Sequence, residues 1–306
     1  MAWSTAGQAN PVSIAAGVAA AVGAALVFGV TSVAEQRSTK RVKKERTGSP
    51  KILLDLVRQP LWDIAIVGTV IGFALQVVGL KYAPLAVVEP ILVFDLVFAV
   101  LIAAYLRRSA DPVMLAGVGA CVVGVAGFLV IARPTAGSGT VSLAEAIWLA
   151  IGAVAAVAIC LVVGQSSETL RPLGMALATG VCYGLSAFLI KLVTDEASHG
   201  GFGHVLGNWP IYALAIAGPV GFVLNQDAFQ SGTFIAPVMA IITAADPLIS
   251  IALAYFLLNE KLSSSPAAIA GEIICLILMT AGIIEIARHS PQAIKAGAAE
   301  AAKAAA

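Results

Sequence analysis

Two aspartates lie near the middle of long apolar stretches, where a carboxylate needs a hydrogen-bonding or ionic partner or has a functional role. Asp95 lies within the run at 84–106 and Asp246 within the run at 234–258. A charged side chain at the centre of a bilayer costs about 2.5 to 3.5 kcal/mol on insertion scales. Two carboxylates that meet there could bind a coupling ion or substrate, or exchange protons, because like charges in a low dielectric cannot both ionise cheaply. The alternative is structural: each carboxyl is protonated, or is hydrogen-bonded to a neighbouring helix.

Proline follows an acidic residue in both of these runs. Glu89-Pro90 and Asp246-Pro247 each combine a carboxyl group with a missing backbone donor. Proline inside a helix frees a carbonyl one turn earlier, so we expect these helices to be kinked or broken where polar groups gather. Broken helices near the midplane line the binding sites of several transporter folds. A kink that serves only helix packing is the alternative.

Four other polar residues within apolar runs are candidates for a site. Gln76 and Asn225 could supply neutral ligands to a substrate, or could simply join neighbouring helices by hydrogen bonds. Lys191 and Glu272 fall in the outer third of the expected bundle, as does Glu89. We expect an outer charged cluster in which Lys191 pairs with either glutamate, the alternative being a lysine that snorkels outward.

The residues leave the presence of a metal open. A hard cation prefers several oxygen ligands in one cage. Asp95, Asp246, Glu89 and Asn225 could supply such a cage if the fold brings them together. The four cysteines lie inside apolar runs without CxxC spacing, which favours packing over metal binding.

Enzyme signatures are absent from the sequence. It contains no P-loop and no HExxH, and its three histidines fall in a loop or in the tail. We therefore expect neither an enzyme nor a cofactor.

The composition indicates a protein that lies in lipid. Of the 306 residues, 59% are hydrophobic and only 11% are charged, with a mean hydropathy of +0.95. Soluble domains carry about 25% charged residues. The apolar residues come in runs of about 20, the length that spans a bilayer as a helix. The sequence thus predicts an all-α polytopic membrane bundle of about nine helices, over 12–34, 62–80, 84–106, 112–132, 142–164, 172–194, 209–228, 234–258 and 266–287.

The basic residues predict the direction of these spans. Fourteen of the 18 Lys and Arg lie in the loop at 35–61, in the other odd loops and in the C-terminal tail. By the positive-inside rule these segments are cytoplasmic, so the N-terminal segment 1–11 is outside and the low-complexity tail 289–306 is inside. We expect a multi-pass protein of the cytoplasmic membrane. The run KRVKKER could also attract nucleic acid, but a net charge of +1 gives no field for that partner.

The chain contains an internal repeat. GFALQ at 72–76 matches GFVLN at 221–225, and Phe28-Gly29 matches Tyr183-Gly184. The segment 12–134 thus repeats as 172–288, with one helix at 142–164 between them. A single intervening span reverses direction, which makes this an inverted 4+1+4 repeat of the kind that secondary transporters use. Duplication without transport is the alternative.

Several short motifs resemble a known family. YAPLAVVEP at 82–90, the Leu-Asn at 224–225 and YFLLNEKL at 255–262 resemble the drug/metabolite transporter superfamily (EamA-like), closest to its NIPA-type magnesium transporters. The resemblance implies a permease that moves a small metabolite, drug-like solute or cation by alternating access. Alternatives are a Mg²⁺ or other divalent-cation permease, a carrier of a lipid-linked solute, and a non-transporting subunit that docks partner proteins. A homo-oligomer remains open.

Overall fold

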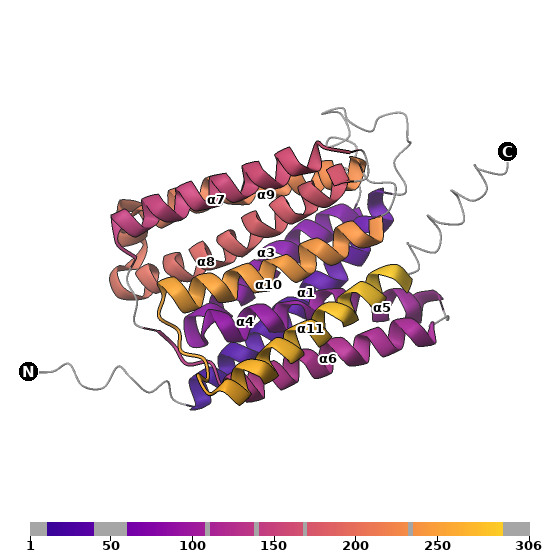
Figure 1. The fold of residues 1–306 in the computed structure, drawn as a ribbon, viewed down its shortest axis with the longest axis horizontal. Coiled ribbons are helices and arrows are strands. Elements are labelled where there is room, and N and C mark those ends of the chain that lie inside the picture. The colour runs from indigo at the N-terminus through magenta and orange to yellow at the C-terminus, as the bar shows by residue number, and fades with distance from the viewer. Residues whose placement is uncertain are drawn as a thin grey trace, which may run out of the picture.

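The fold is a bundle of long helices. The computed structural model describes residues 11–39, 60–107, 111–137, 141–167, 170–231 and 235–289. Within these ranges the chain is almost entirely helical and has no strand beyond an isolated bridge, so the predicted all-α class is confirmed. Most of the basic loop at 35–61, nearly all of segment 1–11 and the tail after His289 lie outside the described residues. The helices are α1 (Pro11–Thr39), α3 (Pro60–Tyr82), α4 (Leu85–Leu92), α5 (Phe94–Arg107), α6 (Pro112–Ala132), α7 (Leu143–Gly164), α8 (Leu170–Gly207), α9 (Trp209–Ser231), α10 (Ile235–Leu257) and α11 (Pro266–His289) (Figure 1).

These helices match the expected membrane spans. The described residues contain eight stretches that are long and apolar enough to cross a membrane, with α4 and α5 together forming one of them. A shorter apolar stretch, Trp209–Asn225, lies in α9, where the seventh span was expected. In lipid every backbone N–H and C=O must be satisfied within the chain, and long helices do this segment by segment.

The third span is interrupted at a single residue, Val93, whose backbone stays in the right-handed helical region, close to the irregularity that Glu89-Pro90 predicts. Its first part, α4, ends at Leu92 and contains Pro90, and α5 begins at Phe94. The second proline behaves differently, because α10 runs through Pro247 as one helix. The first repeat therefore contributes a short helix, α4, that is buried along almost its whole length.

Helix α8 is longer than the sequence predicts. Residues 195–200, expected to be a loop, continue the helix. Gly201 lies outside helical geometry at a φ of 68° and separates this part from a second, short helix that ends at Gly207. Side chains of this stretch contact carbonyls one turn back: Ser198 donates to the Thr194 oxygen, and a ring nitrogen of His199 lies 2.7 Å from the Asp195 oxygen. Glycine tolerates the left-handed backbone at 201 that other residues avoid.

The two halves of the chain pack in the same way. In the first half α1 packs against α3, α4 and α5, and in the second half α8 packs against α9 and α10. The remaining helices of the halves, α6 and α11, lie side by side (Figure 1). The linking helix α7 packs on α8.

Glycines set the separation of α6 and α11. A methyl group on Gly124 would lie 2.6 Å from the Met279 amide nitrogen, and one on Gly282 would lie 2.6 Å from the Cys121 nitrogen. Small residues let helix backbones approach in lipid, where apolar burial supplies little attraction between helices.

We predict that Gly124→Ala destabilises the protein while Gly119→Ala does not. Both glycines are on α6, but a methyl group on Gly119 meets nothing within 4 Å. Overpacking of this kind costs about 1 to 3 kcal/mol. Thermal unfolding of the purified protein in detergent measures both variants, and equal melting temperatures would contradict this packing.

Candidate functional site

The half-helix α4 brings the first two candidate residues together. Glu89 is only 3% exposed, and its Oε1 accepts a hydrogen bond of 3.3 Å from Nε2 of Gln76 on α3. Every residue of α4 from Leu85 to Ile91 is buried. A carboxyl group is therefore held inside the apolar bundle, with an amide from the neighbouring helix as its partner.

Asp95 and Asp246 lie within electrostatic range of this glutamate and of each other. Asp95 is in the first turn of α5, where it accepts a hydrogen bond from the Leu96 amide. Asp246 is on α10, and its Oδ1 is buried without a hydrogen-bond partner among the described residues. The charges of Asp246 and Asp95 thus act on Glu89, and that of Asp95 acts on Asp246.

The surroundings of the two aspartates are equivalent in the two halves. A methyl group on Gly29 of α1 would lie 2.8 Å from the Asp95 carbonyl oxygen, and one on Gly184 of α8 would lie 2.8 Å from the Asp246 carbonyl oxygen. In both cases the β-carbon three residues after the aspartate is the other close neighbour. The expectation that the repeat relates Asp95 to Asp246 therefore agrees with the packing.

A second pair of contacts has the same relation. Gly72 on α3 packs against the ring of Phe28, and Gly221 on α9 packs against the ring of Tyr183, 3.0 Å from where its methyl group would lie. These residues are the ones that matched between the halves in sequence. The helix pairs α1–α3 and α8–α9 are thus built on the same contact.

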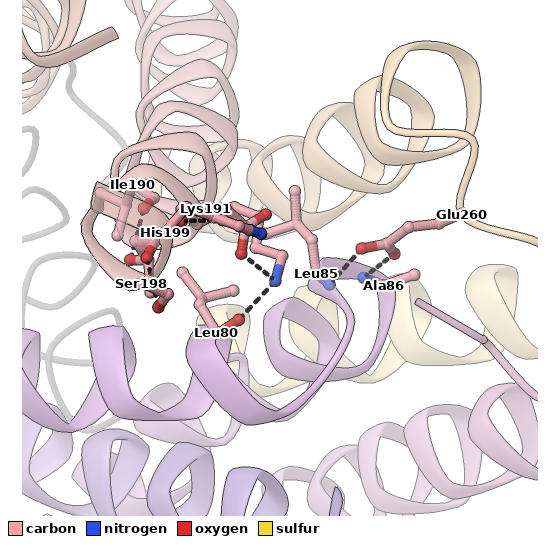
Figure 2. Close-up of polar contacts among 10 residues, drawn as sticks. Leu80, Leu85, Ala86, Ile190, Lys191, Ser198, His199 and Glu260 are labelled. Atoms are coloured by element: carbon pink, nitrogen blue, oxygen red, sulfur yellow. Dashed lines mark hydrogen bonds and ion pairs between the residues drawn. The ribbon is translucent and has the colours of Figure 1, made fainter. Parts of the chain in front are cut away.

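The predicted pairing of Lys191 with Glu89 or Glu272 is wrong. Lys191 Nζ donates to the Leu80 carbonyl at 2.7 Å (Figure 2). It also forms an ion pair with Asp195 at 2.9 Å. Asp195 is one turn further along α8, beyond the expected end of that helix, so the sequence analysis did not consider it as a partner. Glu272 lies on α11, where its Oε1 is buried without a hydrogen-bond partner among the described residues. The outer charged cluster of Lys191 and Glu272 does not form.

Glu260 is a buried polar residue to which the sequence analysis gave no role. It follows α10 and is 2% exposed. Its two carboxylate oxygens accept hydrogen bonds from the Leu85 amide at 2.7 Å and the Ala86 amide at 3.0 Å (Figure 2). Burial raises the pKa of Glu260, while these two hydrogen bonds and the charge of Lys191 oppose the rise. A glutamate in a short connection between apolar helices is the signal that could have found it.

No cage for a metal ion is formed in the described part of the chain. No group of three or more His, Cys, Asp or Glu there is arranged to hold one. Glu89, Asp95 and Asp246 therefore do not form such a cage. Asn225 lies partly buried on α9, and no hydrogen bond joins it to these three carboxyl groups.

Fold and site together define a polytopic all-α membrane protein with acidic groups buried among its helices. The chain is similar to an uncharacterized protein of Corynebacterium glutamicum, with 26% identity over 278 residues that cover 88% of this chain and 94% of the relative. No family model matches the chain. No solved structure matches it either.

We predict that Gln76→Leu destabilises the protein more than Asn225→Leu. The first change leaves the buried Glu89 carboxyl without its donor, at a cost of about 1 to 3 kcal/mol. Asn225 is the repeat-equivalent amide, and no carboxyl group among the described residues accepts a hydrogen bond from it. Its substitution therefore leaves no carboxyl group unpaired, which makes it the matched control. Unfolding in bicelles gives both free energies, and an equal loss in the two variants would show that the hydrogen bond to Glu89 contributes nothing.

Proposed function

We propose that this protein is a secondary membrane transporter that moves a small solute or cation by alternating access. The observation that carries the proposal is the equivalent packing of Gly29 on Asp95 and of Gly184 on Asp246. Two halves built on the same contacts meet at a pair of acidic residues. That is the arrangement expected where a carrier holds its substrate or coupling ion.

The direction of the halves supports the same function. One span, α7, separates them, so the second half enters the membrane from the opposite side to the first. Two halves of opposite direction can exchange conformations, and the exchange opens the central site to one face and then to the other. With the basic loop at 35–61 inside, the α3–α4 connection and Glu260 are at the outer end.

The acidic groups indicate which kind of substrate or coupling ion the site binds. The charges that act on Glu89 in the described residues are those of Asp246 and Asp95, all of one sign. Three carboxylates in an apolar interior need protons or a cation to offset their charge. We therefore propose a proton-coupled carrier or one that takes a cationic solute, within the drug/metabolite transporter superfamily that the motifs resemble. Neither a catalytic step nor a cofactor forms part of this proposal.

A divalent-cation permease is the second candidate, and the same three carboxyl groups favour it. Mg²⁺ prefers oxygen ligands and keeps several waters, so carboxylates that do not converge could still hold a hydrated ion.

We predict that Asp95→Asn and Asp246→Asn each lower transport at least tenfold. The assay is uptake and efflux in proteoliposomes over a panel of metabolites, organic cations and Mg²⁺, with and without a pH gradient. Asp63→Asn is the matched control, because Asp63 is an exposed aspartate in the first turn of α3. If a substrate moves and both variants carry it as fast as the parent, the acidic pair has no part in transport.

We also predict the sidedness of the chain. Alkaline phosphatase, active only outside the cytoplasm, is expected to be active when fused after Arg133 and inactive when fused after Arg107. Green fluorescent protein fused to the C-terminus is expected to fluoresce. Activity of both phosphatase fusions, or of the Arg107 fusion alone, would contradict this sidedness.

A further inference from the structure

One end of the bundle carries a polar contact between the two halves. Glu260, from the second half, accepts hydrogen bonds from the Leu85 and Ala86 amides at the start of α4, in the first half. We call these three residues the clamp. Figure 2 shows the Glu260 side chain reaching across from the connection after α10 to the first turn of α4.

Within the clamp, Glu260 caps the start of α4 although it lies in a distant part of the sequence. Pro84, the residue before α4, makes no side-chain cap of its own. The first N–H groups of a helix lack partners within the helix, and the helix dipole favours a negative charge there. Hydrogen bonds from amides to an ionised carboxylate are stronger than neutral ones. The start of α4 therefore depends on Glu260 for its polar partner.

Other caps in this protein are local. The Asp111 side chain accepts from the Val113 amide at the start of α6, and Ser142 and Glu145 form a capping box at the start of α7. A local cap moves with its own helix and survives any rearrangement of the halves. The clamp joins residues 174 and 175 positions apart in sequence, so it is lost when the halves separate at this end.

Neighbouring hydrogen bonds hold the same segment to the first half. Thr135 and Lys261 exchange backbone hydrogen bonds of 3.0 and 3.3 Å, and the Ser263 amide donates to the Ala132 carbonyl. On the other side of the clamp, Lys191 of the second half donates to the Leu80 carbonyl at the end of α3. The clamp is thus the centre of a row of polar contacts between the halves.

We propose that Glu260 is a gate residue, which holds this end of the bundle closed by capping α4 and releases it when the halves move apart. The proposal rests on the transport function above, because alternating access requires each closed end to open. In the open state Glu260 and the α4 amides would bind water instead of each other. Substitution of Glu260 then favours the open state at this end.

The test measures how accessible the start of α4 is. Ala86 is 1% exposed, so a cysteine at this position, in a chain whose four native cysteines are replaced by alanine, reports opening through its rate of reaction with a membrane-impermeant maleimide. We expect Glu260→Gln to raise this rate at least threefold. Glutamine keeps one acceptor oxygen and places an NH₂ group against the second amide, so half of the clamp is lost.

Glu145→Gln is the matched control, since it removes a capping carboxylate that lies within one helix. It is expected to leave the labelling rate unchanged. A folded Glu260→Gln protein that labels at the parent rate overturns the proposal, and so does an equal rise in the Glu145→Gln protein. The assay needs no substrate, so its result stands apart from failure of the transport assay.

If Glu260→Gln does not fold, an engineered disulfide tests the proposal instead. Thr135→Cys and Lys261→Cys place two cysteines at the bridge beside the clamp. When oxidised, this pair is expected to slow labelling of the cysteine at position 86 at least threefold, and reductant is expected to restore the rate. An unchanged labelling rate after oxidation overturns the proposal.

Discussion

The close approach of two glycines to two acidic residues is the contact on which the rest of the structure depends. Gly29 and Gly184 let α1 and α8 lie directly against the backbones that carry Asp95 and Asp246. In lipid, an apolar side chain gains little free energy when it packs against another helix instead of against lipid tails. Close backbone packing and van der Waals contact must therefore hold the helices together. Any β-carbon at either glycine would separate the helices and move a carboxyl group away from the centre of the bundle.

Polar groups inside such a bundle need partners from other helices. Glu89 obtains one from Gln76, and Lys191 obtains one from the Leu80 carbonyl. The start of the third span has a further need, because the first backbone amides of α4 have no partner within the helix and Glu260 satisfies them. Asp246 Oδ1 is left without a hydrogen-bond partner among the described residues.

Much of the fold was predictable because hydropathy alone determines where a chain crosses a bilayer. The nine expected runs fall on the observed helices, and Pro90 indicated the break between α4 and α5. The partners of charged residues were harder to predict. Lys191 was assigned the wrong partner because Asp195 lies where a loop was expected, whereas α8 continues past it as helix. The role of Glu260 was missed because no periodicity connects it to amides in the other half of the chain.

The most direct test of the central claim is whether Asp95 and Asp246 act as one unit. A double-mutant cycle with Asp95→Asn and Asp246→Asn, measured as free energies of unfolding in bicelles, reports their interaction. Since each substitution removes the same repulsion, we expect the two effects to depart from additivity by more than about 0.5 kcal/mol. Effects that add within about 0.3 kcal/mol would mean that the two carboxyl groups are independent, and the account of a shared acidic site between two halves would then be contradicted.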